Sequence, residues 1–136
     1  MKYRFIVLAI AIFATLFGCQ FREPTPLPVE LLGVWNTSAE KYEGCLFEIK
    51  KDSIIFANTR ILEALNVNTI TKIETIHEEK RILCVIHYKS REDQEYKFTF
   101  YYDPSEGGSI RFKNQLHIKW VKAEALSIEE LLIESD

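Results

Sequence analysis

The sequence predicts an all-β protein: an eight-stranded antiparallel up-and-down β-barrel with a short C-terminal helix. From residue 31 onward, short apolar runs follow one another with turn signals between them, and several alternate apolar with polar residues. Both patterns are typical of half-buried strands joined by short turns. A meander of this kind hides its edges best when it closes into a barrel, so we expect closure. A sandwich of the same strands would give a similar pattern.

Residues 1–18 differ from the rest, and we interpret them as a signal peptide. Lys2 and Arg4 precede an almost unbroken apolar run over residues 5–17. That run has the length of a signal-peptide core and falls short of the roughly 20 residues that cross a bilayer. We therefore expect the chain to be secreted and this segment to be removed.

Leu16-Phe17-Gly18-Cys19 resembles the lipobox of bacterial lipoproteins. The resemblance implies that the leader is cut before Cys19, that Cys19 is lipidated, and that several acyl chains then anchor the protein in a membrane. Gln20 stands where an Asp would imply retention in the inner membrane. The implied location is therefore the outer membrane, with the protein facing the periplasm. An ordinary signal peptide that ends in a free cysteine is the alternative.

We interpret residues 19–30, which begin with the cysteine expected to be lipidated and contain three prolines, as an extended tether. The barrel domain then occupies residues 31–136. The whole chain has 17 basic and 20 acidic residues, and the leader holds two of the bases and none of the acids. This balance argues against a nucleic-acid partner, which would require clustered Lys and Arg.

The first part of the domain contains predicted strands at residues 31–37, 45–50 and 53–57. In the second of these, Cys45, Phe47 and Ile49 share the face that we expect to point inward. A two-residue connection joins the second and third strands as a hairpin. Residues 58–66 carry apolar residues at helical spacing and allow two interpretations: a short helix, or a loop folded over the barrel mouth.

The second part contains clearer strands. Isoleucines recur every third residue within residues 67–77, which breaks strict alternation and predicts a β-bulge. Alternation is regular over residues 81–89 and 95–103. One further strand begins near Ile110, and the last strand ends near Trp120. Many of the side chains expected to face inward are aromatic: Phe47, Tyr88, Tyr96, Phe98, Phe100, Tyr102, Phe112 and Trp120. An eight-stranded barrel has room for side chains or one small ligand, so this set predicts a crowded interior with at most a narrow apolar slot.

The chain ends in a predicted short helix. Ser127 and Glu130 form a capping box, and Leu126 and Leu131 can form the accompanying hydrophobic staple. Ile128, Leu131 and Leu132 make one apolar stripe. Because such a short helix is marginal alone, we expect it to dock on its own barrel, with docking on a partner as the alternative.

Cys45 and Cys84 are the two cysteines of the domain, and the sequence leaves their state open. A secreted protein permits a disulfide between them. Because we expect both side chains to face inward, the alternative is that they are two small buried apolar residues. No C-x-x-C spacing points to a metal or a redox dithiol.

Gly33-Val34-Trp35 on the first strand, followed by a meander and a terminal helix, resembles the lipocalin (calycin) pattern over residues 31–136. The resemblance implies that Trp35 packs at the closed end of the barrel beneath a basic residue of the last strand, Lys119 or Lys122. It also implies a small apolar ligand. Trp35 as a plain core residue is the simpler interpretation.

The motifs of common enzymes are missing from the sequence. It has no G-x-S-x-G, no H-E-x-x-H and no phosphate-binding glycine loop, and its three histidines fall on separate strands. We therefore expect no enzymatic activity, no cofactor and no metal site.

Two non-enzymatic functions remain. The first is binding of a small apolar ligand, with Tyr88, Tyr96, Phe98, Phe100 and Tyr102 as candidate ligand-binding residues and the tyrosine hydroxyls as polar anchors. The alternative is an envelope interaction module with a filled barrel, which binds another protein as an inhibitor or assembly factor.

Overall fold

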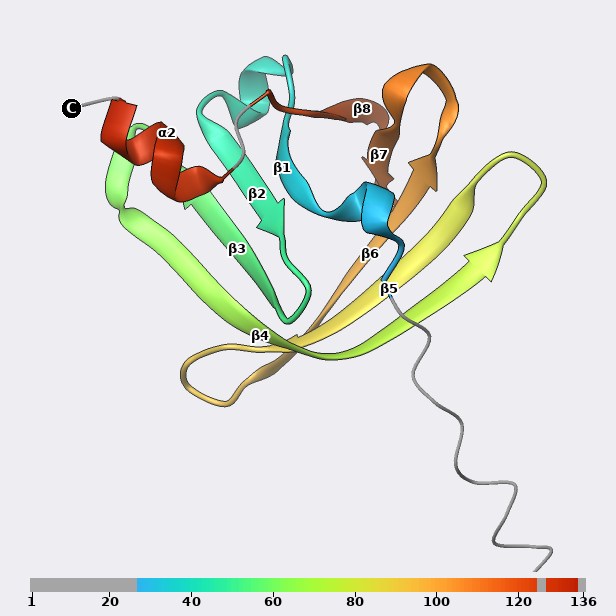
Figure 1. Cartoon of the computed structure of the whole chain (residues 1–136), viewed down its shortest axis with the longest axis horizontal. Helices are drawn as coiled ribbons and strands as arrows, with labels where there is room; N and C mark the ends of the chain where they lie inside the picture. Colours follow the sequence, from blue (N-terminus) through green and yellow to red (C-terminus); the bar gives the residue numbers. More distant parts are fainter. Residues whose placement is uncertain (1–26, 125–126, 135–136) are drawn as a thin grey trace, which may run out of the picture.

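The computed structural model describes residues 27–124 and 127–134, and it shows a closed barrel of eight antiparallel strands in sequence order (Figure 1). The predicted fold class is confirmed, as a barrel and not a sandwich. The signal peptide, Cys19 and most of the tether lie outside the described residues. The strands are β1 (Gly33–Asn36), β2 (Cys45–Ile49), β3 (Ser53–Asn58), β4 (Ile61–His77), β5 (Ile82–Lys89), β6 (Glu95–Asp103), β7 (Ser109–Phe112) and β8 (Gln115–Lys122).

Short helical elements complete the fold. Three 3-10 turns, η1 (Val29–Leu31), η2 (Glu40–Tyr42) and η3 (Ser105–Gly107), precede β1, β2 and β7, and the helix α2 (Ile128–Glu134) follows β8. The barrel closes where β1 pairs with β8, and Trp35 of β1 lies between Phe47 of β2 and Lys122 of β8 in the register.

Residues 58–66 are neither a helix nor a loop. Asn58 ends β3, residues 59–60 form the turn, and residues 61–66 begin the 17-residue β4. Asn58 Oδ1 accepts a hydrogen bond from the Arg60 N–H at 2.9 Å, which holds the turn, and the following residues pair with β3. Pairing with β3 at Ile61 and from Asn66 onward, with a register shift between the two, therefore outweighs the helical spacing of the apolar residues.

The predicted bulge in β4 is confirmed, since its pairing with β5 shifts register between Ile70 and Lys72. The two halves of β4 have different neighbours: Ile61–Thr69 pair with β3, and Thr69–His77 pair with β5. Such a long strand must bend to follow the wall of a small barrel, and a bulge increases local twist and bending.

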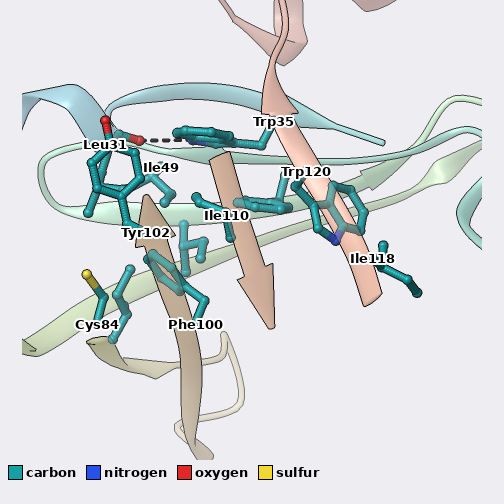
Figure 2. Packing of buried hydrophobic residues seen from close by; sticks show 12 residues of the cluster. Leu31, Trp35, Ile49, Cys84, Phe100, Tyr102, Ile110, Ile118 and Trp120 are labelled. Atoms are coloured by element: carbon teal, nitrogen blue, oxygen red, sulfur yellow. Dashed lines mark hydrogen bonds between the residues drawn. The ribbon is translucent and has the colours of Figure 1, made fainter. Parts of the chain in front are cut away.

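Aromatic rings fill the interior of the barrel. Phe47, only 1% exposed, lies at the centre of this cluster. Its ring centroid is 5.1–6.5 Å from the rings that surround it, which belong to Trp35, Phe56, Phe98, Phe112 and Trp120. Figure 2 shows how neighbouring buried residues from β1 and β5–β8 pack together. The expectation of a crowded interior is confirmed.

One end of the barrel is closed by η1 and a lysine. Leu31 is fully buried, and its carbonyl oxygen accepts a hydrogen bond from Trp35 Nε1 at 3.0 Å (Figure 2). Lys122 Nζ lies 5.5 Å from the centroid of the Trp35 ring and donates to the carbonyl oxygen of Glu30 at 2.6 Å. Of the two lysines considered from the sequence, Lys122 is therefore the one beside Trp35. Gly33 has a φ of +132° and would place a Cβ 3.4 Å from Lys122 Cε, so this position favours glycine.

Helix α2 docks on the outer surface of its own barrel, as expected. Ile128 is 1% exposed and packs with Val34 and Ile55, and partly buried neighbours from β2, β3 and β4 surround them. The predicted cap is present, because Ser127 Oγ accepts a hydrogen bond from the Glu130 N–H at 3.1 Å. Leu126 and the side chain of Leu132 lie outside what the structure describes.

Candidate ligand-binding site

A cavity of about 650 Å³, here called the mouth pocket, opens at the end of the barrel opposite η1. Its existence follows from strand pairing. Beyond the pair Thr69–Lys89, the β3–β4 hairpin and the β5–β6 hairpin no longer pair with each other. The two hairpins therefore leave a hollow between them, whose lining includes Leu65 and Val67 on one side and Tyr88 and Tyr96 on the other.

Three aromatic rings contribute most of the apolar side chains that line the mouth pocket, beside Leu65 and Val67. Tyr88 and Tyr96 are stacked, with centroids 5.5 Å apart and an interplanar angle of 23°. The ring centroid of Phe56 is 5.9 Å from that of Tyr88, and the Phe56 ring also contacts Phe98 of the central cluster. Phe56 is thus the floor of the pocket, and filled core lies beneath it. Tyr96 is 45% exposed, so one wall of the pocket is open to solvent.

The hydroxyl groups of the two tyrosines differ in their surroundings. Tyr96 Oη donates a hydrogen bond to Gln94 Oε1 at 2.6 Å. Burial raises the pKa of Tyr88, and the neighbouring Tyr96 raises it further. Since the ordinary pKa of tyrosine is already near 10, the Tyr88 hydroxyl stays protonated at neutral pH and can donate a hydrogen bond to a ligand.

Polar groups make up the rest of the lining. Asn68 is buried, and its Nδ2 donates to the carbonyl oxygens of Ile54 and Asn66 at 3.4 and 3.2 Å, so its amide holds β4 against β3. Arg91 and Glu92 are exposed at the rim, and neither forms an ion pair within the described part of the chain. The side-chain oxygen of Ser90 accepts from the Glu92 and Gln94 N–H groups, which fixes the turn that carries the rim.

The five residues proposed from the sequence do not share one cavity. Tyr88 and Tyr96 line the mouth pocket. Phe98 lines a second hollow of about 600 Å³ on the other side of β6. Phe100 is fully buried, and Tyr102 is 5% exposed beside Trp35 near the closed end. Phe100 and Tyr102 therefore lie in the packed core.

Of the residues that line the mouth pocket, the sequence predicted only Tyr88 and Tyr96, and the ones it missed include Phe56, Leu65 and Arg91. Phe56 shares the inward face of β3 with Ile54, so strand alternation is the signal that could have found it. Leu65 belongs to a segment whose apolar spacing is helical and Arg91 lies in a turn, so neither position signals a pocket. The loop interpretation of residues 58–66 did place that segment near the barrel mouth, although its structure is a strand.

Cys45 and Cys84 are both free thiols. Cys84 is fully buried and pairs in register with Phe100, whereas Cys45 is half-buried and pairs with Asn58. Asn58 Nδ2 donates to Cys45 Sγ at 3.8 Å. Of the two interpretations left open by the sequence, the structure shows separate thiols.

Alkylation should distinguish the two thiols. Burial raises the pKa of Cys84 to about 12. At pH 8 only about one in ten thousand of its molecules would then carry the reactive thiolate, and the side chain is also sealed from reagent. We expect iodoacetamide to modify Cys45 in the native protein at least tenfold faster than Cys84, as measured by peptide mass mapping. Equal rates in denaturant are the control, and equal rates in the native protein would contradict the buried position of Cys84.

Other ionisable clusters lie on the outer surface. His87 Nε2 is 2.9 Å from Glu74 Oε2, and Lys72 Nζ is 3.1 Å from Glu74 Oε1. The hydrogen bond from His87, together with Lys72, lowers the pKa of Glu74. Within the described residues, no group of three or more His, Cys, Asp or Glu side chains is arranged to hold a metal ion.

The described residues include no helix that is both long enough and apolar enough to span a membrane. Comparison of the chain with protein-family models, with curated proteins and with solved structures finds no match.

Proposed function

We propose that this protein is a non-enzymatic, lipid-anchored lipoprotein of the bacterial cell envelope that binds a small, largely apolar ligand in the mouth pocket of a lipocalin-like barrel. The observation that carries the proposal is the stacked pair of rings, Tyr88 and Tyr96. The pair lines a pocket that is open to solvent, and the barrel interior beneath that pocket is filled with side chains. Large exposed aromatic faces beside a concave surface are a common feature of ligand sites.

The shape of the pocket limits the ligand. A volume of about 650 Å³ is within the range of small-molecule sites. An extended acyl chain would have to displace Phe56 and Phe98 from the packed core, so a compact ligand fits better. Its apolar part would lie on Phe56 and Tyr88, and a polar group would face Arg91, Glu92 and Asn66 at the rim. The best match is thus a compact amphipathic molecule with a ring.

The direction of the chain supports an anchored role. The described chain enters the barrel through η1 at the closed end, and the mouth pocket lies at the far end of the β5–β6 hairpin. If the lipid is attached to Cys19, a tether over residues 19–30 would join the membrane to the closed end. The mouth pocket would then face the periplasm and stay accessible to ligand.

Binding of 1-anilinonaphthalene-8-sulfonate, a compact amphipathic ring compound, tests the site. We expect a rise in its fluorescence, with affinity reduced about fivefold in Tyr96→Ala, since one stacked ring contributes about 1 kcal/mol. Arg91→Ala should weaken binding in the same direction. Tyr101→Ala is the matched control, because Tyr101 lies on the same hairpin with its ring against Arg81.

Native mass spectrometry of the protein purified from a bacterial envelope complements this titration. We expect a small-molecule adduct that disappears on denaturation and is depleted in Tyr96→Ala but retained in Tyr101→Ala. Unaltered dye binding in Tyr96→Ala, together with a bare protein mass, would contradict a ligand site at the mouth.

A further inference from the structure

The first half of β6 has a strand neighbour on one side only. β6 pairs with β5 from Glu95 to Tyr102, but it pairs with β7 only from Phe100 to Asp103. The last link to the β7 side is a hydrogen bond of 3.3 Å from the Lys113 N–H to the Thr99 carbonyl oxygen. The segment before Thr99 therefore has an unpaired edge on the β7 side of β6, here called the β6 edge (residues 95–98).

The β6 edge offers backbone groups at a regular spacing. In an antiparallel strand, the N–H and C=O of every second residue point to the same side. Since the Thr99 carbonyl points toward β7, the N–H and C=O of Lys97 and of Glu95 point to that open side as well. An extended peptide could continue the β6–β7 ladder there.

A hollow of about 600 Å³ accompanies this edge. Phe98 and Phe112 contribute to its lining, with ring centroids 5.0 Å apart. Lys97 and Lys113 line the same hollow, and neither forms an ion pair within the part of the chain that is described. The hollow thus combines an apolar surface with two uncompensated positive charges.

We propose that the β6 edge is a docking site for an extended acidic segment of another protein, which adds to β6 as a further strand. An acidic side chain of the segment would face Lys97 and Lys113, and an adjacent apolar side chain would lie against Phe98 and Phe112. Glu95 does not oppose this arrangement, because its carboxylate lies 3.8 Å from Lys89 Nζ.

The charges argue against a second copy as the occupant. If two β6 edges paired about a two-fold axis at Lys97, the two Lys97 side chains would lie opposite each other, and like charges in that position are destabilising. Lysine on an exposed edge is also a known obstacle to self-association. The same lysine attracts an acidic strand.

This site is separate from the mouth pocket, which includes Tyr88 and Tyr96 and lies on the other side of the β5–β6 hairpin. The proposal therefore does not depend on a small ligand.

Selection of random 12-residue peptides by phage display against the whole protein tests the proposal. We expect the enriched sequences to alternate acidic and apolar residues. A synthetic peptide of the leading sequence should protect the amide of Lys97 from hydrogen exchange. Its affinity should fall about tenfold or more in Lys97→Glu/Lys113→Glu.

Lys80→Glu/Lys51→Glu is the matched control, because both lysines are exposed in turns and the change in net charge is identical. Thermal unfolding of both double variants establishes that they are folded. The absence of enrichment, protection of amides elsewhere, or equal affinity for the wild type and Lys97→Glu/Lys113→Glu would each overturn the proposal.

Discussion

Replacing Phe47 by alanine should lower the free energy of unfolding by about 3–5 kcal/mol. The side chain is 1% exposed, and the rings of Trp35, Phe98 and Trp120 are among those packed directly against it. Its removal would leave a cavity at the point where β1, β2, β6 and β8 meet. These rings are held by closed strands and have little freedom to collapse into the space.

Urea unfolding followed by tryptophan fluorescence measures this loss, because Trp35 and Trp120 are both neighbours of Phe47. Phe47→Leu is the matched control, since it keeps most of the apolar volume and should cost clearly less. Phe56→Ala should also cost less, because Phe56 is half-buried at the floor of the mouth pocket. A loss below about 1 kcal/mol in Phe47→Ala would show that Phe47 is not central to the core.

The fold was predictable because strand alternation is a local property. The face shared by Cys84, Ile86 and Tyr88 could be read directly from a period of two, and the interior of the barrel lies on that face. The bulge in β4 was predictable for the same reason, since the isoleucine spacing departs from that period. The short turns then made antiparallel neighbours the simplest topology.

The position of each inward side chain along the barrel axis was not predictable, and this limited the prediction of the ligand-binding residues. Tyr88 and Tyr102 lie on the same face of the β5–β6 hairpin, but the register pairs Tyr88 with Tyr96 at the mouth and Tyr102 with Ile82 near the closed end. Alternation gives the direction of a side chain and not its position along the barrel axis. A cavity depends on that position.

Two other features depended on register between distant segments. Lys122, and not Lys119, lies beside Trp35 because β1 pairs with β8 at Trp35–Lys122. The interpretation of residues 58–66 as a helix or loop was wrong because the spacing of Ile61 and Leu65 says nothing about the free edge of β3 that this segment joins. Both outcomes depend on tertiary pairing, which overrides local propensity.

Glu48 lies on the outer surface of the barrel beneath α2. Its replacement is the second substitution for which we expect a large loss of stability. It is 2% exposed, and its Oε1 accepts a hydrogen bond from the backbone N–H of Ile128 at 2.8 Å. Its Oε2 lies 3.7 Å from Lys50 Nζ. The carboxylate thus satisfies a free N–H at the start of α2, where negative charge is also favoured by the helix dipole.

Glu48→Ala should therefore destabilise the protein by about 2–3 kcal/mol, because it leaves a buried N–H without an acceptor and opens a gap under the helix. Glu48→Gln is the matched control: its amide oxygen can still accept from Ile128, so the loss should be smaller, about 1 kcal/mol, and should reflect the charge alone.

Hydrogen exchange of the α2 amides, together with the free energy of unfolding, measures both variants. In Glu48→Ala, exchange in α2 should accelerate more than exchange in β5 and β6, because the helix is released from Val34 and Ile55 before the barrel opens. Equal stability of Glu48→Ala and wild type would mean that apolar packing of Ile128 holds the helix without the carboxylate.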